Sequence, residues 1–192
     1  MRILGIVCSP REGGNTEILV REALAAAREV GAQTELVSVI GKNIAPCDAC
    51  GACGKTGVCH IQDDMQSLYK QLEASDAILF GSPVYFGTVS AQAKAIMDRT
   101  FSLLPGRRLK GKVAAPILAV RRVGAGQTRN LLYGFFVLHG MLPVRGAIGY
   151  GREKGEVKQG VGSSHGLSAL EEAKNVGTDV VQMLQAFSKP HG

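Results

Sequence analysis

Residues 2–16 read RILGIVCSPREGGNT and contain the first strand, the first loop and the start of the first helix that the sequence predicts. The first part of this stretch, residues 2–8, is a short apolar run of the kind that forms a buried parallel strand. The part at 9–16 is rich in glycine and short polar side chains, and apolar residues recur after it at helical spacing, up to a natural stop at Gly31. A strand, a polar glycine loop and a helix N-terminus together make an anion site, because free backbone N–H groups and the helix dipole point into the loop.

The side chains of this loop suit an anion such as a phosphate. Arg11 can add a charge-assisted contact. Ser9, Asn15 and Thr16 can donate hydrogen bonds to the same anion. The loop carries neither a Walker A motif nor the dinucleotide-binding G-x-G-x-x-G motif. An ordinary strand–helix turn with an asparagine or threonine cap remains the alternative interpretation.

Strand-like and helix-like segments alternate along the rest of the chain. Five strands and five helices predict an α/β doubly wound parallel sheet with helices on both faces, in a single domain over residues 1–192. Ligands of such sheets bind beyond the carboxyl ends of the strands, so we expect a site where the unusual loops 9–16, 82–88 and 121–127 converge. The other expected strands lie at 34–40, 77–81, 112–120 and 143–150, and the later helices after Asp63-Asp64, at 93–100, at 128–139 and at 167–187.

The loop at 82–88 suits a flat ring better than a phosphate. It reads SPVYFGT, and a ring such as that of a flavin can lie on its backbone with Tyr85 or Phe86 packing nearby. The alternative is a proline-bearing turn whose aromatic side chains close the core, and for Phe86 this is the favoured interpretation. The later segment 151–166 holds five glycines and several charges, which predicts a flexible loop.

Four of the five cysteines fall in a loop at 41–62, with the spacing C-x2-C-x2-C-x5-C. Such a run is the usual sequence form of a [4Fe–4S] site, because three thiolates from one compact loop can face a cubane and a fourth returns from nearby. A zinc site and a redox-active C-x-x-C pair are the less favoured alternatives. Of the other candidates, Cys8 and His139 are expected in the core and His60 in solvent.

Composition excludes several classes of protein. The formal net charge is +6, yet Lys and Arg are scattered, tryptophan is absent and no nucleic-acid motif occurs, so we expect no nucleic-acid partner. An acidic partner protein or a phosphorylated cofactor accounts for the charge as well. No apolar run is long enough for a bilayer and no signal peptide is recognisable, so a cytoplasmic protein without membrane contact is expected.

The three motifs together resemble one family. SPR at 9–11 with GNT at 14–16, the four-cysteine run, and GSPVYFG at 81–87 are similar to those of the iron–sulfur flavoproteins, within the flavodoxin-like, NADPH-dependent FMN reductase superfamily. The resemblance extends from residue 1 to about residue 150. Two positions depart from it: Cys8 stands where relatives commonly have glycine, and Arg121-Arg122 where they tend to have small residues.

The resemblance implies a flavodoxin-like fold with FMN at the strand ends and a [4Fe–4S] cluster on the cysteines. It also implies a homo-oligomer, a dimer or tetramer, that takes electrons from a ferredoxin or from NAD(P)H. The implied FMN residues are Ser9, Arg11, Gly14, Asn15 and Thr16 in the first loop, Ser82, Pro83, Val84, Tyr85, Phe86 and Gly87 in the second, and Arg122 and Gly124 in the third. The implied cluster ligands are Cys47, Cys50, Cys53 and Cys59.

The resulting hypothesis is a flavin-dependent oxidoreductase that couples one-electron carriers to the two-electron chemistry of FMN. In it Arg11 would hold the phosphate, and Arg121 or Arg122 would stabilise the reduced, anionic flavin. Two alternatives stay open. The first is an NAD(P)H-dependent FMN or quinone reductase without a cluster, and the second is a zinc-binding interaction module that is not an enzyme.

Overall fold

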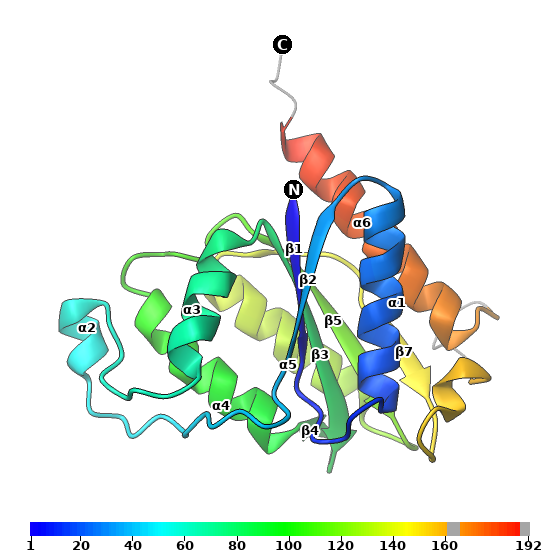
Figure 1. The fold of residues 1–192 in the computed structure, drawn as a ribbon, viewed down its shortest axis with the longest axis horizontal. Helices are drawn as coiled ribbons and strands as arrows, with labels where there is room; N and C mark the ends of the chain where they lie inside the picture. The colour runs from blue at the N-terminus through cyan, green and yellow to red at the C-terminus, as the bar shows by residue number, and fades with distance from the viewer. Residues whose placement is uncertain (161–165, 189–192) are drawn as a thin grey trace.

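The computed structural model describes residues 1–160 and 166–188, and their strands form one sheet with the order β2-β1-β3-β5-β6 (Figure 1). Every neighbouring pair on this path is parallel. The strand β7 continues the edge as a parallel partner of β5, whereas β4 is an antiparallel partner of β3. The strands are β1 (Arg2–Val7), β2 (Gln33–Ser38), β3 (Ala77–Tyr85), β4 (Thr88–Val89), β5 (Val113–Val120), β6 (Leu142–Pro143) and β7 (Ala147–Tyr150).

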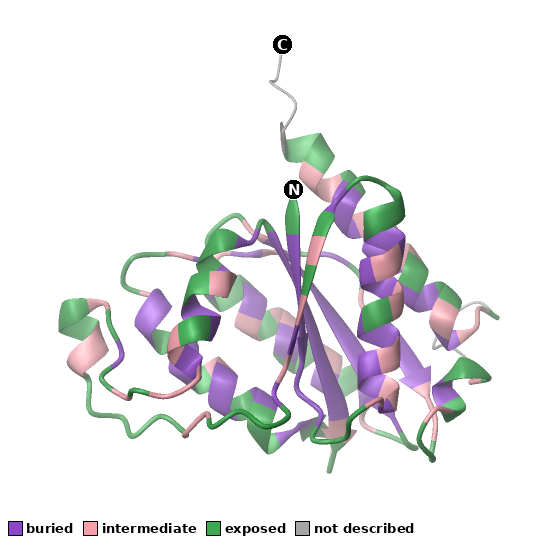
Figure 2. Cartoon of the chain, viewed as in Figure 1, coloured by how far each residue is buried: buried purple, intermediate pink, exposed green. Residues whose placement is uncertain are grey.

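Helices cover both faces of the sheet, with α1 and α6 on one side and α3, α4 and α5 on the other (Figure 1). Side chains of β1 alternate between the two cores: Ile3 and Val7 face α1 and α6, while Leu4 and Ile6 face the opposite layer. The burial pattern in Figure 2 follows these layers, with the buried residues concentrated on the strands and on the inward sides of the helices. The helices are α1 (Asn15–Glu29), α2 (Ala52–Thr56), α3 (Met65–Ala74), α4 (Ala91–Arg99), α5 (Ala125–Leu138) and α6 (Ala169–Ser188), with 3₁₀ turns η1 (Thr100–Leu103) and η2 (Glu156–Lys158).

The strand order reverses between β1 and β3, because β2 lies on one side of β1 and all later strands lie on the other. This is the switch point at which doubly wound sheets bind ligands. Gly81 brings α1 close to it, since a Cβ at this position would lie 2.5 Å from a methyl carbon of Val20 and 2.9 Å from the Ile6 oxygen. The expected doubly wound parallel sheet is therefore confirmed.

Several expected boundaries are wrong in detail. The segment 82–85, expected in a loop, belongs to β3, which turns back at Phe86-Gly87 to pair with β4. The single strand expected at 143–150 is interrupted, because the three residues between Pro143 and Ala147 oppose only two between Ala114 and Ile117. This bulge lies beside Pro116, which has no N–H for the ladder. The helix α5 begins at Ala125 instead of 128, and the short α2 was not expected within the cysteine loop.

The segment expected to be flexible, 151–166, is described up to residue 160 and at 166, so its remaining positions lie outside the described residues. In the described part, the Glu156 carboxylate accepts hydrogen bonds from the N–H groups of Arg152 and Glu153. Val157 in η2 is fully buried. None of the described helices combines the length and apolar character that crossing a bilayer requires.

Candidate functional site

A pocket of about 390 Å³ opens at the switch point, where the carboxyl ends of β1, β3 and β5 meet the N-terminus of α1. The first two of the three expected loops contribute to it, and the third contributes Arg121. Its lining residues are Ser9, Arg11, Gly14, Asn15, Thr16, Pro83, Val84, Tyr85, Phe86, Ala119, Val120, Arg121, Gly151, Arg152 and Lys154.

The N-terminus of α1 is open toward this pocket. Its N-cap residue, Gly14, is extended and has no side chain that could cap the helix. Beside it, Ser9 is buried and its hydroxyl accepts a hydrogen bond from the Arg11 N–H. The uncapped N–H groups and the positive end of the helix dipole therefore remain available to an anion.

Glu17, the acidic residue in the first turn of α1, is hydrogen-bonded to the first loop and to Arg21. The Glu17 carboxylate accepts hydrogen bonds from the Gly13 N–H at 2.8 Å and from Arg21 at 2.8 Å. Partial burial opposes its ionisation, but these hydrogen bonds, with Arg21 and Lys154 nearby, hold the pKa of Glu17 below its ordinary value. Glu17 therefore stabilises the turn of the loop and is itself compensated by cations.

Asn15 joins the first loop to the segment after β7. Its Nδ2 donates to the Glu153 oxygen at 2.9 Å, and its Oδ1 accepts from the Gly155 N–H at 2.8 Å. These two bonds place Arg152 and Lys154 on the pocket, where they add to the cations Arg11 and Arg121. Arg152 and Lys154 were not among the residues expected at the site, although the charges of this glycine-rich segment were a signal.

The second loop shapes the other end of the pocket with Pro83, Val84, Tyr85 and Phe86. Phe86 is fully exposed and has a positive φ of 50°, so the interpretation that it closes the core is wrong. Phe86 lies in the tight turn between β3 and β4, where Val84 pairs with Val89 and Tyr85 with Thr88.

The remaining residues expected at the cofactor lie around this pocket and not in its lining. Ser82 is fully buried, where its hydroxyl donates to the Pro83 oxygen and accepts from the Ser90 N–H. Gly87 and Arg122 line an adjoining pocket of about 370 Å³. Gly124 has a φ of 95°, and a Cβ there would lie 2.7 Å from the Gly87 Cα, so its glycine lets the second and third loops meet.

A second pocket, of about 530 Å³, is lined by all four clustered cysteines together with Asp48, Ala49, Gly51, His60, Asp98 and Phe101. Cys47 and Cys50 are exposed, Cys53 is half-buried and Cys59 is buried. Burial, and then the proximity of the other three thiols, raises the pKa of Cys53. The loop thus brings four cysteine side chains to one cavity.

The four sulfur atoms are not drawn together as tightly as around a single metal ion. Tetrahedral zinc with Zn–S bonds of 2.3 Å requires sulfur atoms about 3.8 Å apart. Among the described residues, the one group of three possible ligand atoms within 4.8 Å of each other is Asp48, Cys50 and His60, not a set of cysteines. His60 is exposed, as expected, and its Nε2 lies 2.7 Å from the Asp48 Oδ2.

Two further expectations are confirmed by burial. Cys8 is fully buried at the end of β1, and burial raises the pKa of its thiol. His139 is buried with its Nε2 3.0 Å from the Thr100 hydroxyl, and burial lowers its pKa. Both are core residues and neither lines the two pockets.

Most of the chain matches one known protein family. The family described as NADPH-dependent FMN reductase matches residues 1–153. The chain belongs to this family. It is therefore a flavin-dependent oxidoreductase with FMN as its cofactor, in agreement with the expected superfamily and activity class.

The relatives within this family include proteins named for iron and sulfur. The chain is 38% identical over 199 residues to an iron–sulfur flavoprotein of Methanocaldococcus jannaschii, covering 98% of this chain and 100% of that protein. It is 32% identical over 191 residues to an iron–sulfur flavoprotein of Archaeoglobus fulgidus, covering 97% and 81%. Among solved structures, an NADH:FMN oxidoreductase superposes with a TM-score of 0.71 at 18% identity, covering 98% and 91%, a likeness of fold alone.

Proposed function

We propose that the chain is an electron-transfer flavoprotein that holds FMN at the switch point and a [4Fe–4S] cluster on Cys47, Cys50, Cys53 and Cys59. It would couple one-electron carriers to the two-electron chemistry of the flavin. The observation that carries this proposal is the second pocket, in which four cysteine side chains from one compact loop line a single cavity. A [4Fe–4S] cluster takes four cysteine thiolates, and these four side chains around one cavity supply that number.

For FMN we assign the phosphate to the end of the first pocket formed by Ser9, Arg11, Gly14 and Thr16. The uncapped helix N-terminus and the cation of Arg11 support this placement. The isoalloxazine would lie against the end made by the 83–86 segment. The loops that would contact the isoalloxazine ring would be supported by Ser82, Gly87 and Gly124, which lie outside the pocket lining. Arg121 and Arg122 would lie at the edge of the ring.

Asn15 takes a different role in this proposal from the direct phosphate contact that the sequence indicated. Both polar atoms of its side chain are bonded to the 153–155 segment, so we assign it to holding that segment in place. Arg152 and Lys154 would then meet the phosphate from the side opposite Arg11.

The electron donor is proposed to be a ferredoxin or NAD(P)H, and the protein is proposed to act as a homo-oligomer in the cytoplasm, as a dimer or tetramer of a single-domain chain. Apolar side chains exposed in the described part of the chain support an interface. They include Phe86 and Val123 beside the first pocket and Val137 and Leu138 at the end of α5.

An NAD(P)H-dependent FMN or quinone reductase without a cluster is the second candidate, favoured by the family match over residues 1–153. Substitution of Cys53 by serine separates the two. Our proposal predicts that Cys53→Ser lowers iron per chain severalfold in anaerobically prepared protein while FMN per chain stays constant. A purified parent protein that contains FMN but no iron would instead establish the second candidate.

A further inference from the structure

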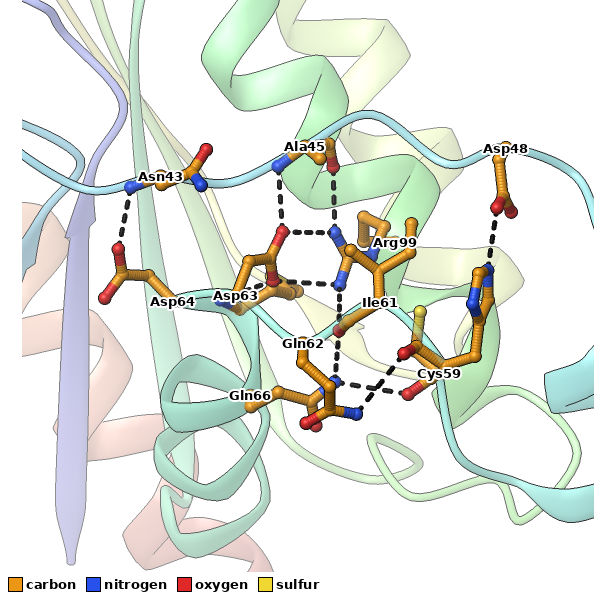
Figure 3. A network of polar contacts seen from close by, with 12 residues as sticks. Asn43, Ala45, Asp48, Cys59, Ile61, Gln62, Asp63, Asp64, Gln66 and Arg99 are labelled. Atoms are coloured by element: carbon orange, nitrogen blue, oxygen red, sulfur yellow. Dashed lines mark hydrogen bonds and ion pairs between the residues drawn. The ribbon is translucent and has the colours of Figure 1, made fainter.

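The cysteine loop, residues 41–62, leaves the sheet after β2 and returns at the start of α3. We call the part of this loop before Cys47 its first limb and the part after Cys59 its second limb. The two limbs lie side by side near Ala45, two residues before Cys47, and Ile61, two residues after Cys59 (Figure 3). The end of α4 reaches between them. There Arg99 donates from Nη1 to the Ala45 oxygen at 2.9 Å and from Nη2 to the Ile61 oxygen at 3.2 Å.

Asp63 completes the bridge from the α3 side. Its Oδ2 accepts from the Ala45 N–H at 2.8 Å and from Arg99 Nη1 at 2.7 Å. Its Oδ1 accepts from Arg99 Nη2 at 3.0 Å and from the Met65 N–H at 3.1 Å. Guanidinium and carboxylate thus meet in a two-pronged pair that also binds both limbs through the backbone.

The surroundings hold this pair in one orientation. The Tyr69 hydroxyl donates to the Arg99 backbone oxygen at 2.9 Å. Gln66 Nε2 donates to the Ile61 oxygen at 2.7 Å and to the Cys59 oxygen at 3.2 Å, so the limb that carries the fourth cysteine is bonded as well. The side chains of Arg99 and Asp63 are 0% and 3% exposed, so water does not compete for these bonds.

Stability of the fold does not explain this arrangement. Removing two charges from water opposes their attraction, and apolar side chains of similar volume usually serve a core as well as a buried ion pair does. What apolar side chains cannot supply is directed hydrogen bonds to Ala45 and Ile61. The pair therefore fixes the separation of the two limbs rather than the packing beneath them.

We infer that Arg99 and Asp63 are positioning residues that set the distance between the limbs carrying Cys47 and Cys59, and that they do so before any metal binds. This inference rests on the proposed cluster site and deepens it. Cys59 is the ligand at the longest spacing, so its placement depends most on a contact outside the C-x2-C-x2-C run. Residues around a metal site that orient its ligands typically affect metal affinity by about 10–100-fold.

The test uses the double variant Arg99→Met/Asp63→Leu, which removes both charges and avoids leaving one buried and unpaired. The matched control is Arg145→Gln/Asp179→Asn, an ion pair on the opposite side of the sheet. Each protein is prepared without metal, examined by hydrogen exchange at the Ala45 amide, and then reconstituted anaerobically with limiting iron and sulfide. Iron and FMN per chain are measured on the same samples.

We expect the Ala45 amide to be protected in the metal-free parent and control, and to exchange at least about tenfold faster in the double variant. Iron per chain should fall about tenfold in the double variant, with FMN per chain unchanged. The inference is overturned if the variant keeps the parent's exchange rate and iron content, or if it loses FMN together with iron. An unprotected Ala45 amide in the metal-free parent overturns it without any variant. A parent that keeps this protection but binds no iron would refute the proposed cluster instead.

Discussion

Replacing Asn15 by alanine tests how the first pocket recognises a phosphate. The change removes the two hydrogen bonds that hold the 153–155 segment against the start of α1, at 2.9 and 2.8 Å. Each such bond contributes about 0.5–1.5 kcal/mol net, and one of the two is exposed, so the segment loses about 1–2 kcal/mol of docking free energy. If its cations contact the phosphate, FMN binding weakens by the same free energy, which corresponds to about 5–30-fold in Kd.

The assay compares two ligands that differ only in the phosphate. Metal-free apoprotein is titrated with FMN and with riboflavin, and quenching of flavin fluorescence gives each Kd. Asn15→Ala should raise the Kd for FMN about 5–30-fold and that for riboflavin less than about twofold. The control Gln182→Ala, at an exposed position of α6, should change neither. Equal weakening of both flavins, or unchanged FMN affinity, would refute the assignment of Arg152 and Lys154 to the phosphate.

Three further predictions concern stability. Gly81→Ala places a methyl group 2.5 Å from a side chain of α1 and should lower the unfolding free energy by about 1–3 kcal/mol in urea titrations, whereas Gly134→Ala, at an open helical position, should not lower it. Arg99→Met alone leaves the Asp63 carboxylate buried without its partner and should lower the unfolding free energy by about 3–5 kcal/mol in the same assay. A single variant as stable as the double variant Arg99→Met/Asp63→Leu would contradict this. Burial lowers the pKa of His139, so below about pH 6.5 the unfolded chain binds a proton more readily than the folded protein does. The contribution of His139 to stability is therefore complete above about pH 6.5 and declines as the pH falls. His139→Gln should flatten this part of a plot of melting temperature against pH.

The outline of the fold followed from the sequence because burial leaves a local signal. Apolar runs such as Ile3–Val7 and glycines at strand ends mark the parallel strands and the switch point, and the side chains of that run are buried in the two cores. The interruption near residue 145 did not follow, since it arises from Pro116 on the neighbouring strand, which no local pattern reveals. Pairing between distant segments decides such details.

For the candidate site, residues that are clustered in the sequence were predictable, and residues brought in from distant segments were not. The first loop and 83–86 line one pocket and the four cysteines line another, because chemistry-bearing residues were clustered in the sequence. Arg152 and Lys154 were missed because they reach the pocket through Asn15, about 140 residues earlier. The same holds for Arg99, which looks like an ordinary helix-end arginine until Ala45 and Ile61 are placed beside it.

The proposed protein carries FMN and a [4Fe–4S] cluster on one chain and stores electrons on both. Anaerobic reductive titration, followed by the visible spectrum, counts those electrons directly. FMN accepts two electrons and a [4Fe–4S] cluster accepts one, so we expect about three equivalents per chain, with flavin and cluster absorption both bleached. A titration complete at about two equivalents, with flavin bleaching alone, would contradict it.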